Sequence, residues 1–190
     1  MSDVLTPLEG GGLVRLARAA IEDRLEPRDA VGAVLRALAM TAGLTAPRAV
    51  FVTLQQPAPD GRRALRGCIG STEADTPAHD AVVDAAVQAA FHDPRFSPLT
   101  VEEYASIVVS VSALTPAGPV ASVDAIVPGE DGLILEHRLG RAVFLPEVAA
   151  ELGWSREQLL HRLCRKAGLA DGAWRGGRLL SFRSQKFGGC

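Results

Sequence analysis

The feature that most constrains the fold is a predicted β-hairpin in the first half of the chain. Residues 49–54 are rich in strand-forming side chains, and residues 64–70 form a second short strand-like segment. Between them, residues 57–61 (Pro-Ala-Pro-Asp-Gly) have the composition of a turn. Parallel strands need a crossover of a dozen or more residues, so strands joined this closely are expected to pair antiparallel.

Helix-like and strand-like segments follow one another irregularly along the rest of the chain. Apolar residues recur at helical spacing over residues 13–25, 29–40, 76–91 and 155–168. Strand-like runs occupy residues 107–114, 132–138, 141–145 and 178–183, and the middle two form a second hairpin. The run over 107–114 is apolar enough to be a central strand. We therefore predict an α+β fold, with a mixed or antiparallel β-sheet and helices packed on it, and not a doubly wound parallel sheet.

The length of 190 residues suits one domain with a substantial core, and the 47 % hydrophobic content is typical of a globular chain. We expect a single domain over residues 1–190. Residues 1–9 are predicted to be a flexible N-terminal segment, and the glycines at 10–12 a linker before the first helix.

Composition argues against several functional classes. The net charge of −2 gives no general attraction to nucleic acid or to acidic membranes. The first residues lack the basic and apolar regions of a signal peptide, so none is expected, and no apolar run is long enough to cross a bilayer. Three cysteines, an odd number, do not make a disulfide framework, so we expect a cytoplasmic protein. The sequence has no phosphate loop, dinucleotide fingerprint or zinc-ligand spacing, and we expect no cofactor and no metal.

Residues 65–70, Leu-Arg-Gly-Cys-Ile-Gly, place a thiol on a short strand between two glycines. Alternation predicts that the odd-numbered side chains face the core, and that Arg66, Cys68 and Gly70 face the other side. The backbones of Arg66 and Cys68 would then be about 7 Å apart, and a fixed cation near a thiol stabilises the thiolate. Gly67 and Gly70 leave backbone that a ligand can approach closely. The alternative is that Cys68 is a small, packed core residue.

Further candidates lie in the segments that follow the motif. His79 comes early in the next predicted helix, where it is either a base within reach of Cys68 or a solvent-facing side chain. Asp93 and Arg95 lie in a loop made rigid by prolines, residues 92–98, where they contribute to a site. The alternative is that this loop only ends the helix, with His92 at the C-terminal cap and Asp93 in a turn. The predicted site therefore has Cys68, Arg66 and Asp93 as catalytic residues, and Gly67, Gly70, Arg95 and His79 as ligand-binding residues.

The other two cysteines are less promising. Cys164 lies on the apolar stripe of its predicted helix and is expected in the core. Cys190 is the last residue and is expected to be exposed and mobile. Arg162, Arg165 and Lys166 form the outer face of the Cys164 helix, which is typical of a solvated surface.

Several blocks of sequence occur together in one order. They are residues 51–54, 65–70, 93–100, 109–112, 144–149, 153–154, 163–168 and 182–187. In these blocks the chain resembles the AMMECR domain family, known in bacteria as protein A of the AmmeMemoRadiSam system. The resemblance spans nearly the whole chain from about residue 10, and Leu-Arg-Gly-Cys-Ile-Gly at 65–70 is its most specific motif.

The resemblance implies an α+β fold in which two lobes meet at a cleft, with the motif strand central. It implies no reaction, because the family's biochemical activity is not established. The family's name implies association with a Memo-like protein and with a radical SAM protein.

Three functions remain as hypotheses. The first is a cleft that binds a small molecule or peptide, with thiol chemistry at Cys68 and with Arg66, Asp93, Arg95 or His79 assisting. The second is a non-catalytic binding or adaptor module that partners the Memo-like and radical SAM proteins. The third and weakest is nucleic-acid binding through basic residues: Arg162, Arg165, Lys166 and Arg178.

Overall fold

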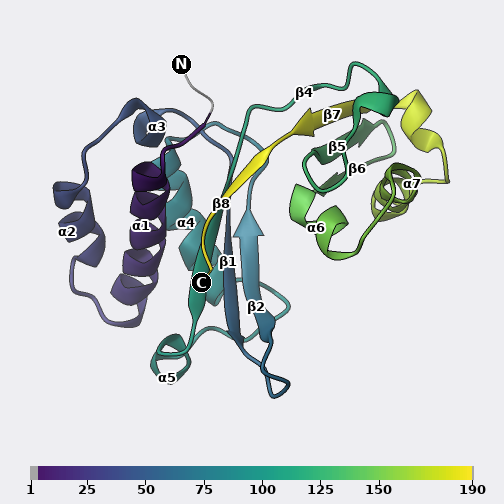
Figure 1. Ribbon diagram of the computed structural model, residues 1–190. Coiled ribbons are helices and arrows are strands. Elements are labelled where there is room, and N and C mark those ends of the chain that lie inside the picture. Colours follow the sequence, from purple (N-terminus) through teal and green to yellow (C-terminus); the bar gives the residue numbers. More distant parts are fainter. Residues whose placement is uncertain (1–3, 190) are drawn as a thin grey trace. The chain divides into compact units, whose positions relative to one another are not determined.

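The computed structural model describes residues 4–189, and the chain divides into two compact units. Unit 1 contains the chain up to Leu114 together with the residues from Gln185 onward, and unit 2 is Thr115–Ser184. Each unit has its own sheet with helices packed on it (Figure 1), and the predicted α+β fold is confirmed. The cleft between two lobes stays a prediction.

The sheet of unit 1 has four strands in the order β2-β1-β3-β8. Their bounds are β1 Val50–Pro57, β2 Arg63–Gly70, β3 Val108–Leu114 and β8 Ser184–Gly188. Strand β1 pairs antiparallel with both β2 and β3, so the first predicted hairpin and the central position of residues 107–114 are confirmed. The motif strand, in contrast, is β2 at the edge of the sheet. The expectation that it is central is wrong, because β3 comes from far along the chain and pairs with β1 on the opposite side from β2.

Two long helices, α1 (Pro7–Leu25) and α4 (Ala78–Phe91), pack on one face of this sheet (Figure 1). Shorter helices accompany them: α2 Ala30–Ala37, α3 Ala42–Thr45 and α5 Val101–Tyr104. Three even-numbered residues of β1, Val50, Val52 and Leu54, are buried beneath the helices. The odd-numbered residues of β1, such as Thr53, therefore lie on the other face of the sheet.

Helix α1 begins earlier than predicted. Thr6 caps it in a capping box with Glu9, and Leu5 is buried. The glycines at 10–12 are helical, and a side chain at Gly10 would overlap the ring of Phe187, which would lie 2.1 Å from the added Cβ. The linker prediction is therefore wrong. The predicted flexible segment 1–9 is part of the fold from Leu5 onward, and Met1–Asp3 lie outside the described residues.

Unit 2 contains the second predicted hairpin. Its sheet has the order β4-β7-β5-β6, with bounds β4 Gly118–Pro119, β5 Gly132–His137, β6 Gly140–Phe144 and β7 Arg178–Phe182. Its helical segments are the 3-10 turns Val123–Ala125 and Ala173–Gly176, and the α-helices α6 Pro146–Glu151 and α7 Arg156–Lys166. Cys164 is fully buried in this unit's core, as predicted. Within residues 4–189, no helix is both long and apolar enough to span a membrane.

Candidate functional site

The motif strand contains a β-bulge that breaks the predicted alternation. Leu54 pairs with Gly67 and Gln55 pairs with Leu65, so Arg66 is the extra residue on β2. As a result Leu65 is 41 % exposed whereas Arg66 is only 5 % exposed. The prediction that Leu65 faces the core is therefore wrong, and the alternation no longer places Arg66 beside Cys68.

The Arg66 side chain binds the segment that leads into α5. Its Nε donates to Glu103 Oε1 at 3.0 Å, and an Nη donates to Glu103 Oε2 at 3.1 Å and to the Ser97 carbonyl at 2.9 Å. These bonds lower the pKa of Glu103. Because the guanidinium is engaged with a carboxylate, Arg66 acts as an anchor for this segment and not as the cation that faces the thiol.

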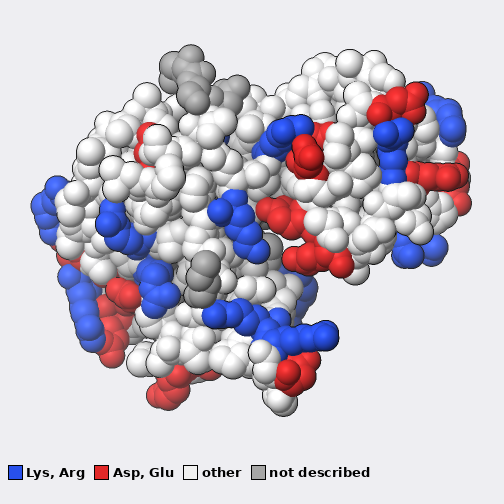
Figure 2. Space-filling view, viewed as in Figure 1, with Lys and Arg blue, Asp and Glu red and all other residues white. Residues whose placement is uncertain are grey.

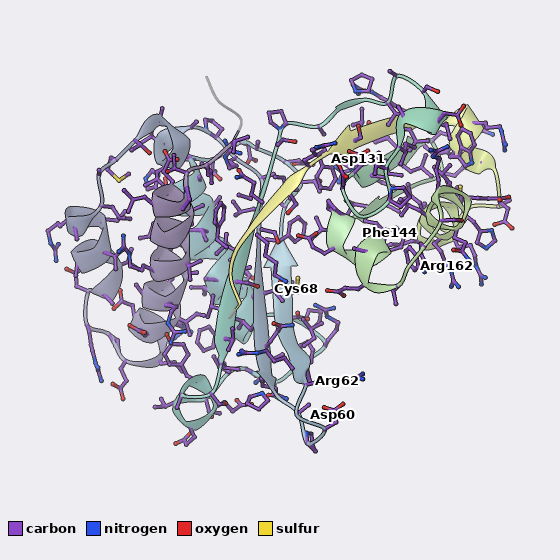
Figure 3. The ribbon with its side chains drawn as sticks, viewed as in Figure 1. Asp60, Arg62, Cys68, Asp131, Phe144 and Arg162 are labelled. Carbon is purple, nitrogen blue, oxygen red and sulfur yellow. The ribbon has the colours of Figure 1, made fainter. Side chains whose placement is uncertain are left out.

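Cys68 lies on the face of the sheet opposite the long helices. Its neighbour Gly67 faces α4, where a Cβ would lie 2.2 Å from the Ala89 carbonyl oxygen. Cys68 is directly opposite Thr53 on β1, and its sulfur lies 3.3 Å from Thr53 Oγ1. The side chain is half-buried, and Figure 3 shows it on β2. It is therefore neither sealed in the core nor fully exposed.

Asp93 and Arg95 bind the backbone of Cys68 at the outer edge of β2. Asp93 Oδ2 accepts from the Cys68 N–H at 2.9 Å, and an Arg95 Nη donates to the Cys68 carbonyl at 3.1 Å. Because β2 is an edge strand, these two backbone groups point away from β1. The two side chains thus supply the hydrogen bonds that a neighbouring strand would make. We call this pair of residues the Asp93–Arg95 clamp.

The clamp is held together by its own charges. Arg95 donates to both carboxylate oxygens of Asp93, at 2.9 Å from Nε and 2.6 Å from Nη. Asp93 is buried, whereas the Arg95 side chain is 52 % exposed. The hydrogen bonds that Arg95 donates hold the pKa of Asp93 far below its usual range, and the same bonds raise the pKa of Arg95. Asp93 is therefore a fixed carboxylate, unsuited to proton transfer near neutral pH.

The structure does not bring His79 to Cys68. His79 Nδ1 lies 2.9 Å from the Leu44 carbonyl oxygen at the start of α4. Gly67 packs against Ala89, ten residues further along that helix, which corresponds to about 15 Å of helical rise. His79 is also on the helix side of the sheet. It is therefore placed as a packing residue of α4.

A pocket of about 290 Å³ lies beside the end of the motif strand, within unit 1. Ile69 and Gly70 of β2 form part of its wall, and so do apolar side chains of β1 and α4: Val50, Ala81 and Ala85. Its charged residues are Glu73, Asp75, Asp84 and the buried Arg48, which donates to the Leu114 carbonyl at 3.1 Å. Counted over residues 4–189, the pocket thus has three carboxylates and one guanidinium.

Sequence reasoning missed these acidic residues. Asp84 lies on the same helical turn as Ala81 and Ala85, but spacing alone does not show which neighbour this face meets. Glu73 and Asp75 lie in the connection between β2 and α4, where acidic residues are commonly solvated. Thr53, in contrast, follows from the hairpin once its register is known.

Unit 2 has a pocket of its own, of about 680 Å³. In it His161 Nδ1 lies 2.9 Å from Asp171 Oδ1, and the Arg175 guanidinium lies 4.4 Å from the centre of the Trp174 ring. Two basic residues, Arg156 and Arg175, and two acidic residues, Glu157 and Asp171, are among those that line it. This pocket therefore has no net preference for one sign of charge.

The basic residues considered for nucleic-acid binding are mostly engaged within unit 2. Lys166 Nζ donates to the Val143 carbonyl at 2.8 Å, and Arg162 lies over the Trp154 ring. Arg178 pairs with Glu136 at 3.6 Å. On the face drawn in Figure 2, acidic and basic side chains are interspersed on each unit. No broad basic surface is present on this face.

Comparison with known proteins gives one consistent family. A family model described as AMMECR1 matches residues 14–187. The chain is 41 % identical to a protein of Thermofilum pendens over 95 % of this chain and 89 % of that one. It is 40 % identical to Protein MJ0810 of Methanocaldococcus jannaschii over 97 % of this chain and 92 % of that one. The crystal structure of uncharacterized protein PH0010 from Pyrococcus horikoshii is similar, with a TM-score of 0.81 and 34 % identity, over 97 % of this chain and 93 % of that one.

Proposed function

The chain belongs to the AMMECR1 family, and from its own geometry we propose that it is a binding module that accepts a lysine or arginine side chain of a partner in the pocket beside the motif strand. The observation that carries the proposal is the charge of this pocket. Glu73, Asp75 and Asp84 line it, and Arg48, its one cation among the residues that the structure describes, is buried and donates to a backbone carbonyl. A positively charged group would therefore be attracted into it.

The shape of the pocket suits a long side chain with a charged end. Its volume of about 290 Å³ is at the lower end of the range for ligand pockets. Ile69, Ala81 and Ala85 supply apolar wall that can cover the methylene groups of lysine or arginine. Among residues 4–189, no three His, Cys, Asp or Glu side chains are grouped as a metal site, so the carboxylates are spread along the pocket and suit an organic cation better than a metal ion.

The proposal predicts charge-dependent capture of short peptides. Two random libraries of acetylated, amidated peptides would be passed over the immobilised full-length protein, one with lysine fixed at the centre and one with glutamine. We expect the lysine library to be retained about tenfold better, which corresponds to about 1.4 kcal/mol. The Asp75→Asn, Asp84→Asn double variant should lose this preference.

The matched control is Glu157→Gln, which removes an exposed carboxylate in unit 2 and should leave the preference unchanged. Equal retention of the lysine and glutamine libraries by the native protein would contradict the proposed function.

For the partner, we propose the proteins that the family's bacterial name associates with it, the Memo-like protein and the radical SAM protein. Each purified protein would be tested for capture by the native chain and by the Asp75→Asn, Asp84→Asn variant at micromolar concentration. Capture that the variant loses is the expected result. Failure to capture either protein, or equal capture by the variant, would exclude these partners at this pocket.

Thiol chemistry at Cys68 is the second candidate, favoured by the half-buried sulfur and by the adjoining Arg95. Arg95 is the cation of the clamp, and its guanidinium is bound to the Cys68 carbonyl. A reducing cytoplasm, the location we propose, would keep this thiol free. A reactive thiolate predicts that iodoacetamide labels Cys68 at pH 7 faster than it labels glutathione. Labelling no faster than glutathione would dismiss this candidate, and the buried Cys164 should remain unlabelled in the folded protein.

A further inference from the structure

At the end of β2 that follows the bulge, two positions, Cys68 and Gly70, have backbone groups that point away from β1. In an antiparallel pair, residues alternate between those bonded to the partner strand and those directed outward. Cys68 is of the outward kind, because its N–H and C=O bind Asp93 and Arg95. Gly70, two residues later, is directed outward by the same alternation, and the next residue, Ser71, again bonds to β1 because its N–H donates to the Val50 carbonyl.

These two positions differ in how their backbone groups are satisfied. At Cys68 the Asp93–Arg95 clamp occupies the edge. At Gly70 neither backbone group has a hydrogen-bond partner among residues 4–189. Proteins normally cover or interrupt the edge strands of their sheets, because unpaired backbone groups bind other strands. Here the Asp93–Arg95 clamp covers the edge at Cys68 but not at Gly70. Gly70 is also part of the wall of the pocket lined by Glu73, Asp75 and Asp84, which we call the acidic pocket.

We propose that the partner segment binds as an added β-strand, antiparallel to β2, with one of its residues paired with Gly70 and an adjacent lysine or arginine in the acidic pocket. This inference rests on the proposed function and adds the mode of binding. An antiparallel strand makes both hydrogen bonds through a single residue, so only a short segment has to become ordered. Recognition of this kind draws affinity from the main chain and specificity from alternate side chains.

The alternation of the added strand determines which residue enters the pocket. The side chain opposite Gly70 would lie on the same face as Cys68, away from the helices. The residues before and after it point to the helix side, where Ile69 and α4 line the pocket. The recognised segment therefore has a basic residue immediately next to the residue that pairs with Gly70. The backbone N–H of that basic residue points away from β2 and makes no bond to it.

Peptide N-methylation separates this binding mode from simple charge recognition. The probe is the lysine library described above, prepared in two further forms. N-methylation of the residues on both sides of the lysine removes the N–H that would donate to Gly70. We expect retention to fall about tenfold, as for the loss of one hydrogen bond. N-methylation of the lysine itself is the matched control and should leave retention unchanged.

Each outcome has a distinct meaning. If retention falls equally with both N-methylated forms, or falls with neither, strand addition is overturned. A preference for the lysine library over the glutamine library would then still support the proposed cation pocket. Loss only when the lysine is N-methylated also overturns it, because the hydrogen bonds would then lie on the wrong residue. No retention of any library overturns both proposals.

Hydrogen exchange of the protein gives an independent readout. A peptide selected from the lysine library should slow exchange of the Gly70 amide at least about tenfold. The Cys68 amide, already bonded to Asp93, should change little. Protection at Cys68 with none at Gly70 would contradict the proposed pairing.

Discussion

Replacing Gly67 by alanine is expected to lower the free energy of unfolding by about 3 kcal/mol, at the upper end of the cost of overpacking. The added Cβ would lie 2.2 Å from the carbonyl oxygen of Ala89 and 3.1 Å from its carbonyl carbon. These are backbone atoms of α4, so no side-chain rotation can relieve the overlap. Helix and strand would have to separate where both are held by the unit 1 core. Urea unfolding followed by circular dichroism measures the effect.

Gly11→Ala is the control for this substitution. Gly11 is an exposed residue of α1, and nothing lies within 4 Å of an added Cβ. Alanine there should stabilise the protein by up to about 1 kcal/mol, because it favours the helix. If Gly67→Ala unfolded at the same urea concentration as the native protein, the close contact between β2 and α4 would be wrong.

Replacing Asp93 by asparagine is expected to cost about 2–3 kcal/mol at pH 7, because a buried charge pair loses one partner. The native carboxylate accepts hydrogen bonds from the Cys68 N–H and from the Arg95 backbone and side chain. An asparagine amide would point N–H groups at some of these donors. The cost stays below that of a fully buried pair because Arg95, at 52 % exposed, can be rehydrated.

The same substitution predicts a change in the pH dependence of stability. Because the pKa of Asp93 is lowered on folding, its contribution is fully present above the unfolded-state pKa, about 3.9, and is lost as pH falls toward the folded-state pKa. The stability difference between native protein and Asp93→Asn should therefore be constant from pH 7 to 5 and shrink below about pH 4.

Asp60→Asn is the matched control for the clamp. Asp60 lies in the turn between β1 and β2 (Figure 3) and should change stability by less than about 0.5 kcal/mol. A difference for Asp93→Asn that persisted undiminished at acidic pH would contradict the role of its charge.

Much of the fold was predictable because the signals are local. The first hairpin, the second hairpin and the strand over residues 107–114 follow from strand-forming runs separated by turn residues. Strand β8 was missed because residues 184–188 contain glycine and polar side chains and have no strand-forming pattern. These residues form a strand by pairing at the edge of the sheet of unit 1. The start of α1 was missed because three successive glycines normally indicate a linker. Here Phe187, from the other end of the chain, fills the space that they leave.

The candidate site was predicted only in part. Cys68, Asp93 and Arg95 are brought together, but through the backbone of Cys68 and not through its thiol. Arg66 and His79 are directed to other partners. The residues of β2 alone do not predict a bulge, because a bulge is defined by the register between two strands.

The sequence by itself determined most of the elements and the family, and it singled out Cys68, Asp93 and Arg95, which the structure brings together. Helical and strand periodicities are read from neighbouring residues, and the motif at 65–70 is a continuous block. Only the tertiary structure decided where the motif strand lies and which residues contact it. The strand lies at the edge of the sheet because β3 pairs with β1 on the side away from β2. The Asp93–Arg95 clamp binds its backbone at Cys68, and the pocket beside α4 adjoins it at Gly70. These contacts join residues far apart in the chain, so local periodicity does not encode them.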